Sequence, residues 1–163
     1  MNAIHRILMT TDGSITAIIE AIAQGKVEVR TVEQRIIPAD DKISEILDVD
    51  VGEEVNYRVV YLEVNGEIYA KAISLTPIKR LEESFKDDLM KADIPIGKIM
   101  KKHRIEARRE IRWAKVVNSN SRLARELGIK EGGKVIVRNY DIIMGGETLI
   151  NITEYFPMEK FSL

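Results

Sequence analysis

Two charged residues occupy positions where the strand pattern of the sequence predicts apolar side chains. Glu154 lies in the alternating segment 148–156, and Arg58 lies in the alternating segment 55–64. The residues that share a face with them are Ile150, Ile152 and Phe156 for the glutamate and Val60, Leu62 and Val64 for the arginine. A charge that leaves water must find a partner, lose its charge or bind a ligand. The two residues together predict a buried site for a small anionic molecule.

Arg58 is the predicted carboxylate anchor of this site. A planar guanidinium group donates two parallel hydrogen bonds to a carboxylate, and it keeps its charge at physiological pH. The alternative is a structural role, in which Arg58 pairs with Glu63 or with a carboxylate of a neighbouring strand. Glu154 has a structural alternative as well, as the partner of an arginine, and Arg58 is the candidate.

Arg109 is the third charged residue that is predicted to lie on an apolar face. That face contains Ile105, Ala107, Ile111, Trp113 and Val117, whereas Arg108, Glu110 and Arg112 lie on the opposite face. Arg109 is therefore a candidate for binding a second carboxylate. The alternative is a solvated basic surface, because the stretch 98–112 is rich in Lys and Arg. Nucleic acid is not the expected partner, since acidic residues interrupt this stretch and the chain has a single tryptophan.

Two predicted helix starts offer backbone N–H groups to an anion. The first is at Ser14, Ile15 and Thr16, and the second is at Ile96 and Gly97 after a proline. Ordinary helix caps are the alternative at both places. A nucleotide loop is not indicated, because the Walker lysine and the glycine pattern are missing.

The composition predicts one soluble domain spanning residues 1–163. The chain is 45% apolar and 31% charged with a net charge of -1, and it has no cysteine. His5 and His103 are expected at the surface, and no metal site or cofactor is expected. No apolar run reaches the roughly 20 residues of a spanning helix, and the start lacks the apolar core of a signal peptide. A cytoplasmic protein without membrane contact is expected, and the oligomeric state stays open.

The spacing of apolar residues and turn residues predicts six strands and several helices. A first helix is expected over 14–25, a strand over 26–37, a short helix over 43–47 and a hairpin of 55–64 with 67–76 through Asn65-Gly66. A helix over 81–90, a break at 93–97, a short helix to 102 and a strand over 105–117 follow. Ser119 or Asn120 caps a helix that Gly128 ends, before a hairpin of 134–144 with 147–158 through Gly145-Gly146. No internal repeat is evident. The predicted class is α+β, with a six-stranded antiparallel sheet covered by helices.

Four short segments in this order resemble the chorismate pyruvate-lyase family in its archaeal-type branch. They are residues 11–16 (TDGSIT), 57–62 (YRVVYL), 95–97 (PIG) and 153–157 (TEYFP). The resemblance implies the chorismate lyase-like fold and a lyase that converts chorismate to 4-hydroxybenzoate and pyruvate in an enclosed pocket without a cofactor. It also implies that Arg58 holds a carboxylate and that Glu154 faces the ring hydroxyl.

The same resemblance implies that backbone amides at Ile15 and Ile96 line the pocket, where better-known bacterial enzymes have methionine and leucine. The basic strand aligns with the family through either Arg108 or Arg109. The ligand implied is a small aromatic or cyclohexadiene carboxylate. Residues 124–135 also resemble the effector-binding domains of a bacterial transcription-regulator family, so a non-catalytic ligand-binding domain of the same fold is the alternative function.

Overall fold

A six-stranded antiparallel sheet organises the molecule, and its strand order is β1-β2-β3-β6-β5-β4. The computed structural model describes residues 1–91 and 94–162. The strands are β1 (Glu28–Pro38), β2 (Glu54–Val64), β3 (Glu67–Pro77), β4 (Arg108–Asn118), β5 (Lys134–Met144) and β6 (Glu147–Pro157). The helices are α1 (Ala3–Thr10), α2 (Ile15–Ala23), α3 (Asp41–Leu47), α4 (Glu83–Lys91), α5 (Ile96–Lys102) and α6 (Ser121–Leu127), and two short 3₁₀ segments are η1 (Ile78–Arg80) and η2 (Met158–Phe161). The predicted class is confirmed.

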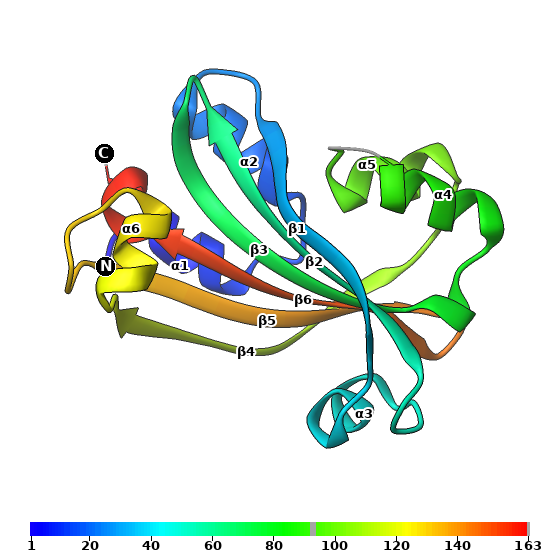
Figure 1. Cartoon of the computed structure of the whole chain (residues 1–163). Helices are drawn as coiled ribbons and strands as arrows, with labels where there is room; N and C mark the ends of the chain where they lie inside the picture. Colours follow the sequence, from blue (N-terminus) through cyan, green and yellow to red (C-terminus); the bar gives the residue numbers. More distant parts are fainter. Residues whose placement is uncertain (92–93, 163) are drawn as a thin grey trace.

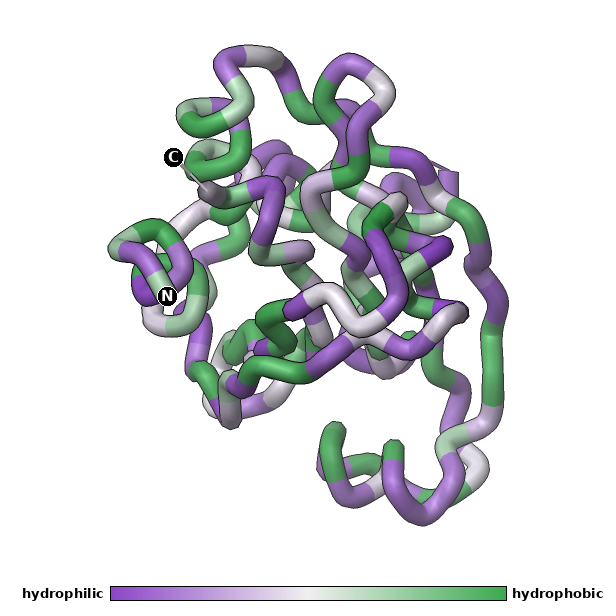
Figure 2. The backbone as a smooth tube through the Cα atoms, turned by 90° about the vertical axis from the view of Figure 1, so that its left-hand side faces the viewer, coloured by the Kyte–Doolittle hydropathy of each residue, from purple (hydrophilic) through white to green (hydrophobic). Residues whose placement is uncertain are grey.

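Helices cover both faces of the sheet (Figure 1). The front face, which carries Arg58 and Glu154, packs against α1, α2, α4 and α5, and the rear face packs against α3 and α6. Figure 2 shows that hydrophobic and hydrophilic residues are interspersed along the backbone. None of the helices in the described part of the chain is long and apolar enough to cross a membrane.

Both predicted hairpins are present with the expected turn geometry. Asn65 and Gly66 have φ of 50° and 80°, and Gly145 and Gly146 have φ of 59° and 77°. Left-handed backbone at both central positions matches the twist of the flanking strands, so these dipeptides fix the register of β2 with β3 and of β5 with β6. The predicted break between helices at 93–97 includes Asp93, which lies outside the described residues. The cap that precedes α6 is Asn120, whose side chain accepts a hydrogen bond from the backbone N–H of Leu123.

The prediction that the helix after Ser14 comes first is wrong, because α1 precedes it. The side chain of Asn2 caps α1, and the Nδ1 atom of His5 accepts a hydrogen bond from the backbone of Asn2. His5 is buried rather than at the surface, since its Nε2 atom also lies 2.9 Å from the carbonyl oxygen of Met158 in η2. The helix was missed because it has eight residues and no glycine or proline marks its end.

The chain folds as two halves with the same order of elements, which the sequence analysis did not detect. Each strand and rear helix of the second half begins 80 residues after its counterpart, as the starts of β1 and β4, α3 and α6, β2 and β5, and β3 and β6 show. Ile73 of β3 pairs with Thr153 of β6, so an approximate two-fold axis passes through this central pair. Few equivalent positions carry the same residue in both halves, and Arg58 with Arg138 is one of these pairs. The low identity between the halves explains why the repeat is not visible in the sequence.

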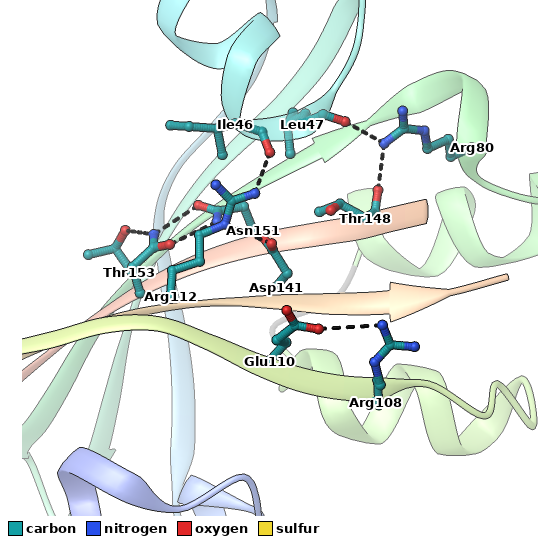
Figure 3. Close-up of polar contacts among 11 residues, drawn as sticks. Ile46, Leu47, Arg80, Arg108, Glu110, Arg112, Asp141, Thr148, Asn151 and Thr153 are labelled. Carbon is teal, nitrogen blue, oxygen red and sulfur yellow. Dashed lines mark hydrogen bonds and ion pairs between the residues drawn. The ribbon is translucent and has the colours of Figure 1, made fainter. Parts of the chain in front are cut away.

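A polar network on the rear face attaches α3 to the second half of the sheet (Figure 3). Arg112 bridges the carbonyl oxygen of Ile46 at 2.6 Å and the carboxylate of Asp141 at 2.7 Å. Arg80 donates to the carbonyl oxygens of Leu47 and Thr148, each at 2.7 Å. These arginines satisfy carbonyl groups at the end of α3 that have no partner within the helix. They therefore connect the rear cover of one half to the strands of the other.

The placement of Trp113 and Val117 on the face of Arg109 is wrong. A register shift between Ile111 and Trp113 in the pairing of β4 with β5 places one extra residue in β4. Such a bulge reverses the alternation beyond it, so Trp113 lies opposite Asn139 on the rear face and is 42% exposed.

Candidate functional site

A cavity of about 450 Å³ lies on the front face, between the central strands and the starts of α2 and α5. This is a usual size for a site that binds a small molecule. All residues predicted for the site line it, namely Ser14, Ile15, Thr16, Arg58, Ile96, Gly97, Arg109 and Glu154. Their roles remain predictions, but the fold brings them together from five separate elements. The cavity reaches the surface beside α5, where Gly97, Lys98 and Lys101 are exposed.

Glu154 is buried at 5% exposure, and its carboxylate is held by two residues of β5. The Nε atom of Arg138 donates to Oε1 at 2.8 Å, and the hydroxyl group of Tyr140 donates to Oε2 at 3.2 Å. The pairing follows from the register, because Glu154 of β6 lies directly opposite Arg138 of β5. The predicted ion-pair partner Arg58 is thus replaced by Arg138. Each carboxylate oxygen can accept more than one hydrogen bond, so the site keeps acceptor capacity towards the cavity.

Arg138 is buried at 1% exposure and is fixed from several sides. Its Nη1 atom donates to the carbonyl oxygens of Leu8 at 3.1 Å and Thr11 at 2.7 Å, at the end of α1. The guanidinium group also lies 4.9 Å from the ring centre of Tyr140. Burial and the neighbouring carboxylate of Glu154 raise the pKa of Tyr140, so its hydroxyl group stays a hydrogen-bond donor. The network therefore holds the carboxylate of Glu154 in one orientation.

Arg58 is buried at 2% exposure on β2, opposite Ser74 of β3. Its Nη2 atom donates to the carbonyl oxygen of Ile94 at 3.1 Å and lies 3.5 Å from the hydroxyl oxygen of Thr31. The alternative partner Glu63 pairs instead with Arg30 at 2.7 Å, on the other face of the sheet. Arg58 thus lines the cavity from β2 and connects that strand to the segment just before α5.

Arg109, rather than Arg108, faces the cavity. Arg109 lines it, and its Nη1 atom lies 3.4 Å from the carbonyl oxygen of Asp12, just before α2. Arg108 points the other way and lies 3.4 Å from the carboxylate of Glu110 (Figure 3). The side chain of Arg109 also reaches the start of α5, since a Cβ atom added at Gly97 would lie in ordinary van der Waals contact, 3.5 Å, with the Nη2 atom of Arg109.

The two helix starts differ in how they are capped. The hydroxyl group of Ser14 accepts a hydrogen bond from the backbone N–H of Ala17 at 3.2 Å, so this side chain is an ordinary cap of α2. Pro95 precedes α5 and gives it no side-chain cap. Both starts line the cavity on the side facing Arg58 and Glu154. The geometry therefore agrees with both interpretations of Ser14, as a cap and as part of the lining.

Comparison with known proteins assigns the chain to a family. Residues 9–162 match the family model described as Chorismate pyruvate-lyase Rv2949c-like. The chain belongs to this chorismate pyruvate-lyase family. A protein of Methanocaldococcus jannaschii, MJ0807, which is named as a candidate lyase, is 36% identical over 159 residues, covering 94% of this chain and 78% of that protein. A chorismate pyruvate-lyase of Mycobacterium tuberculosis is 28% identical over 165 residues, covering 99% of this chain and 83% of that enzyme. These relationships support lyase activity in general for this member of the family.

The fold of this family member is also similar to that of a solved regulator structure. PhnF from Mycobacterium smegmatis superposes with a TM-score of 0.77 at 16% identity, over 91% of this chain and 65% of that one. The effector domain of PhnF superposes with a TM-score of 0.74 at 14% identity, over 93% of this chain and 92% of that domain. At this identity the likeness establishes the shared fold. It confirms the predicted chorismate lyase-like architecture.

The sequence analysis of this lyase-family chain missed Tyr140 and Ser74, which line the cavity, and Arg138, which holds the carboxylate of Glu154. Arg138 shows the same signal as Arg58, a charge two residues from Ile136 and Tyr140 on an apolar strand face. Tyr140 gives no separate signal, because an aromatic residue in a strand usually belongs to the core. Ser74 was not among the predicted site residues, although it lines the cavity. Within the described residues, no group of three or more His, Asp or Glu side chains is arranged to hold a metal ion.

Proposed function

We propose that the chain converts chorismate to 4-hydroxybenzoate and pyruvate in the front-face cavity. The observation that supports this most strongly is that Arg58 and Glu154 line one cavity of about 450 Å³ in a member of the chorismate pyruvate-lyase family. The cavity suits a single small ring, and Arg58 and Glu154 lie on different strands around it. A ring with polar groups at opposite ends would therefore bind in one orientation.

For this reaction the protein must mainly orient the substrate and stabilise the charge that develops as the ether bond breaks. The ether bond between the ring and the enolpyruvyl group breaks, and its electron pair leaves with the enolpyruvate oxygen. The ring carbon that bears the hydroxyl group loses a proton, which makes the ring aromatic, and enolpyruvate takes up a proton to become pyruvate. Preorganised charges that face the leaving oxygen lower the barrier of such a step.

In this proposal Arg58 binds a carboxylate of the substrate and draws negative charge from the breaking bond. Glu154 accepts a hydrogen bond from the ring hydroxyl, and Arg138 with Tyr140 keeps that carboxylate in place. Arg109 binds the second carboxylate near the rim of the cavity. The starts of α2 and α5, at Ile15 and Ile96, enclose the ring from the helical side.

Turnover of chorismate without added metal or nucleotide tests the proposal. Chromatography should detect 4-hydroxybenzoate and pyruvate in equal amounts. Arg58→Ala should lower kcat/KM by about 100-fold or more, the usual loss for one group that stabilises a developing anion. The matched control is Arg108→Ala, which changes an exposed arginine outside the cavity and should keep the wild-type rate. An Arg58→Ala protein that folds and keeps near-normal turnover would refute the assignment.

A non-catalytic effector-binding domain is the second candidate function. The observation that favours it is the likeness of the fold to the effector domain of PhnF, over 93% of this chain. Such a domain would bind the same class of small carboxylate without converting it. Tight binding of chorismate by calorimetry, with no product after prolonged incubation, would favour this candidate over the lyase.

A further inference from the structure

The two halves of the sheet place different groups at equivalent positions beside the cavity. In the second half, Arg138 of β5 lies opposite Glu154 of β6, and the two form an ion pair at 2.8 Å. In the first half, Arg58 of β2 lies opposite Ser74 of β3. Ser74 and Glu154 are equivalent residues, because each lies one residue beyond the central Ile73–Thr153 pair. A hydroxyl group therefore stands in one half where a carboxylate stands in the other.

Ser74 is buried and lines the cavity. Its exposure is 4%, and it lies on the same face of the sheet as Arg58 and Glu154. No hydrogen bond joins its hydroxyl group to any residue in the described parts of the chain. Because Ser74 lines the cavity and its hydroxyl group has no partner among the described residues, that group is a candidate for a hydrogen bond with the occupant.

The chemistry of the hydroxyl group selects the kind of ligand atom. A carboxylate at position 74 would repel an anionic ligand from the first half of the cavity, whereas a serine hydroxyl can donate a hydrogen bond to it. Arg58 is the cross-strand neighbour, so the two side chains lie close enough to hold the same small group. Donors from two adjacent strands suit the two oxygens of a carboxylate.

We infer that the hydroxyl group of Ser74 donates a hydrogen bond to the carboxylate of the ligand beside Arg58, and that Ser74 contributes to the selection of carboxylate ligands. The identity of the ligand rests on the proposed function, whereas the role of Ser74 rests on its burial, its position and the missing hydrogen bond. The ligand then lies across the central strands, with its carboxylate towards the first half and its hydroxyl group towards Glu154 of the second half.

Calorimetric binding of 4-hydroxybenzoate to three serine variants tests this inference. Ser74→Ala should weaken binding by about 10- to 100-fold, the value of a hydrogen bond to a charged group. Ser74→Thr keeps a hydroxyl group and should stay within a few-fold of the wild type. Ser119→Ala is the matched control, because Ser119 is equally buried at 4% but lies outside the cavity and donates to the carbonyl oxygen of Lys130. It should leave the Kd unchanged.

Thermal melting without ligand separates binding from structure. Ser74→Ala should keep the Tm of the wild type, because no protein hydrogen bond is lost. The inference is overturned if Ser74→Ala binds 4-hydroxybenzoate as the wild type does, or if its loss of binding comes with a large drop in Tm. Wild-type protein that binds 4-hydroxybenzoate but does not convert chorismate would refute the lyase alone. Wild-type protein that does not bind 4-hydroxybenzoate would overturn the inference about Ser74.

Discussion

Replacing Arg138 by methionine should destabilise the protein far more than replacing any surface arginine. Methionine fills much of the same volume but leaves the carboxylate of Glu154, which is 5% exposed, without its cation. Removing one partner of a buried ion pair typically costs about 3–5 kcal/mol. The carbonyl oxygens of Leu8 and Thr11 also lose their donor, and each lost hydrogen bond adds roughly 1 kcal/mol. The expected loss in free energy of unfolding is therefore about 5–7 kcal/mol.

Urea unfolding followed by circular dichroism measures this loss. For a domain of this size, 1 kcal/mol corresponds to about 2–4 °C in Tm, so the melting temperature of Arg138→Met should fall by roughly 10–30 °C. The matched control is Arg30→Met, since Arg30 forms an ion pair of similar length, 2.7 Å, with Glu63 but is 53% exposed. Exposed pairs contribute about 0–1 kcal/mol, so the control should melt within a few degrees of the wild type.

A double variant separates the unpaired charge from the loss of packing. Adding Glu154→Gln to Arg138→Met removes the buried charge, so the double variant should recover about 2–3 kcal/mol of the loss. The reasoning is refuted if Arg138→Met costs less than about 1 kcal/mol, or if the double variant is no more stable than the single one. Either result would mean that the ion pair does not hold the second half of the cavity together.

Three further changes test other parts of the structure. Tyr140→Phe should cost about 1–2 kcal/mol in urea unfolding, because the carboxylate beside it loses a buried donor. A hydrogen bond from Lys102 lowers the pKa of the Asp88 carboxyl group from its ordinary value of 3.8. The stability that this carboxylate adds is therefore present above pH 3.8 and is lost as the pH falls below it. Asp88→Asn should flatten the acid side of a plot of Tm against pH. Arg112→Ala should speed amide exchange in α3 while changing global stability by only about 1–2 kcal/mol, and unchanged exchange would contradict its anchoring role.

Local signals made most of the fold predictable. Asn65-Gly66 and Gly145-Gly146 each specify a two-residue turn, so both hairpins and their registers follow from the sequence. The end of helix α6 at Gly128, which has a φ of 67°, follows from the same preference of glycine for left-handed backbone. The missed helix α1 and the bulge before Trp113 lack such signals, because a short helix and one extra residue in an edge strand leave little trace in the pattern.

The sequence predicted which charged residues lie at the candidate site but not which of them form an ion pair. A charge on an apolar strand face marks Arg58 and Glu154, and it also marks Arg138. Which arginine meets the glutamate depends on strand order, since β5 lies beside β6 whereas β2 is separated from β6 by β3. Strand order is a non-local property, and local alternation does not encode it. The burial of the charges could therefore be derived from the sequence, but the partner could not.

The approximate two-fold symmetry of the sheet explains why the difference between Ser74 and Glu154, which occupy equivalent positions, matters for the site. A sheet with exact two-fold symmetry would present the same groups to both ends of a ligand at its centre, and a ligand with two different ends would then bind equally well in either direction. Here Arg58 and Arg138 keep the symmetry, whereas Ser74 and Glu154 break it. The carboxylate of Glu154 forms an ion pair with Arg138 in its own half, whereas Ser74 places a neutral hydroxyl group beside Arg58 in the other half. In the proposed site, Glu154 would accept a hydrogen bond at one end of the cavity and Ser74 would donate one at the other, which is the polarity that we propose for binding a hydroxylated ring carboxylate.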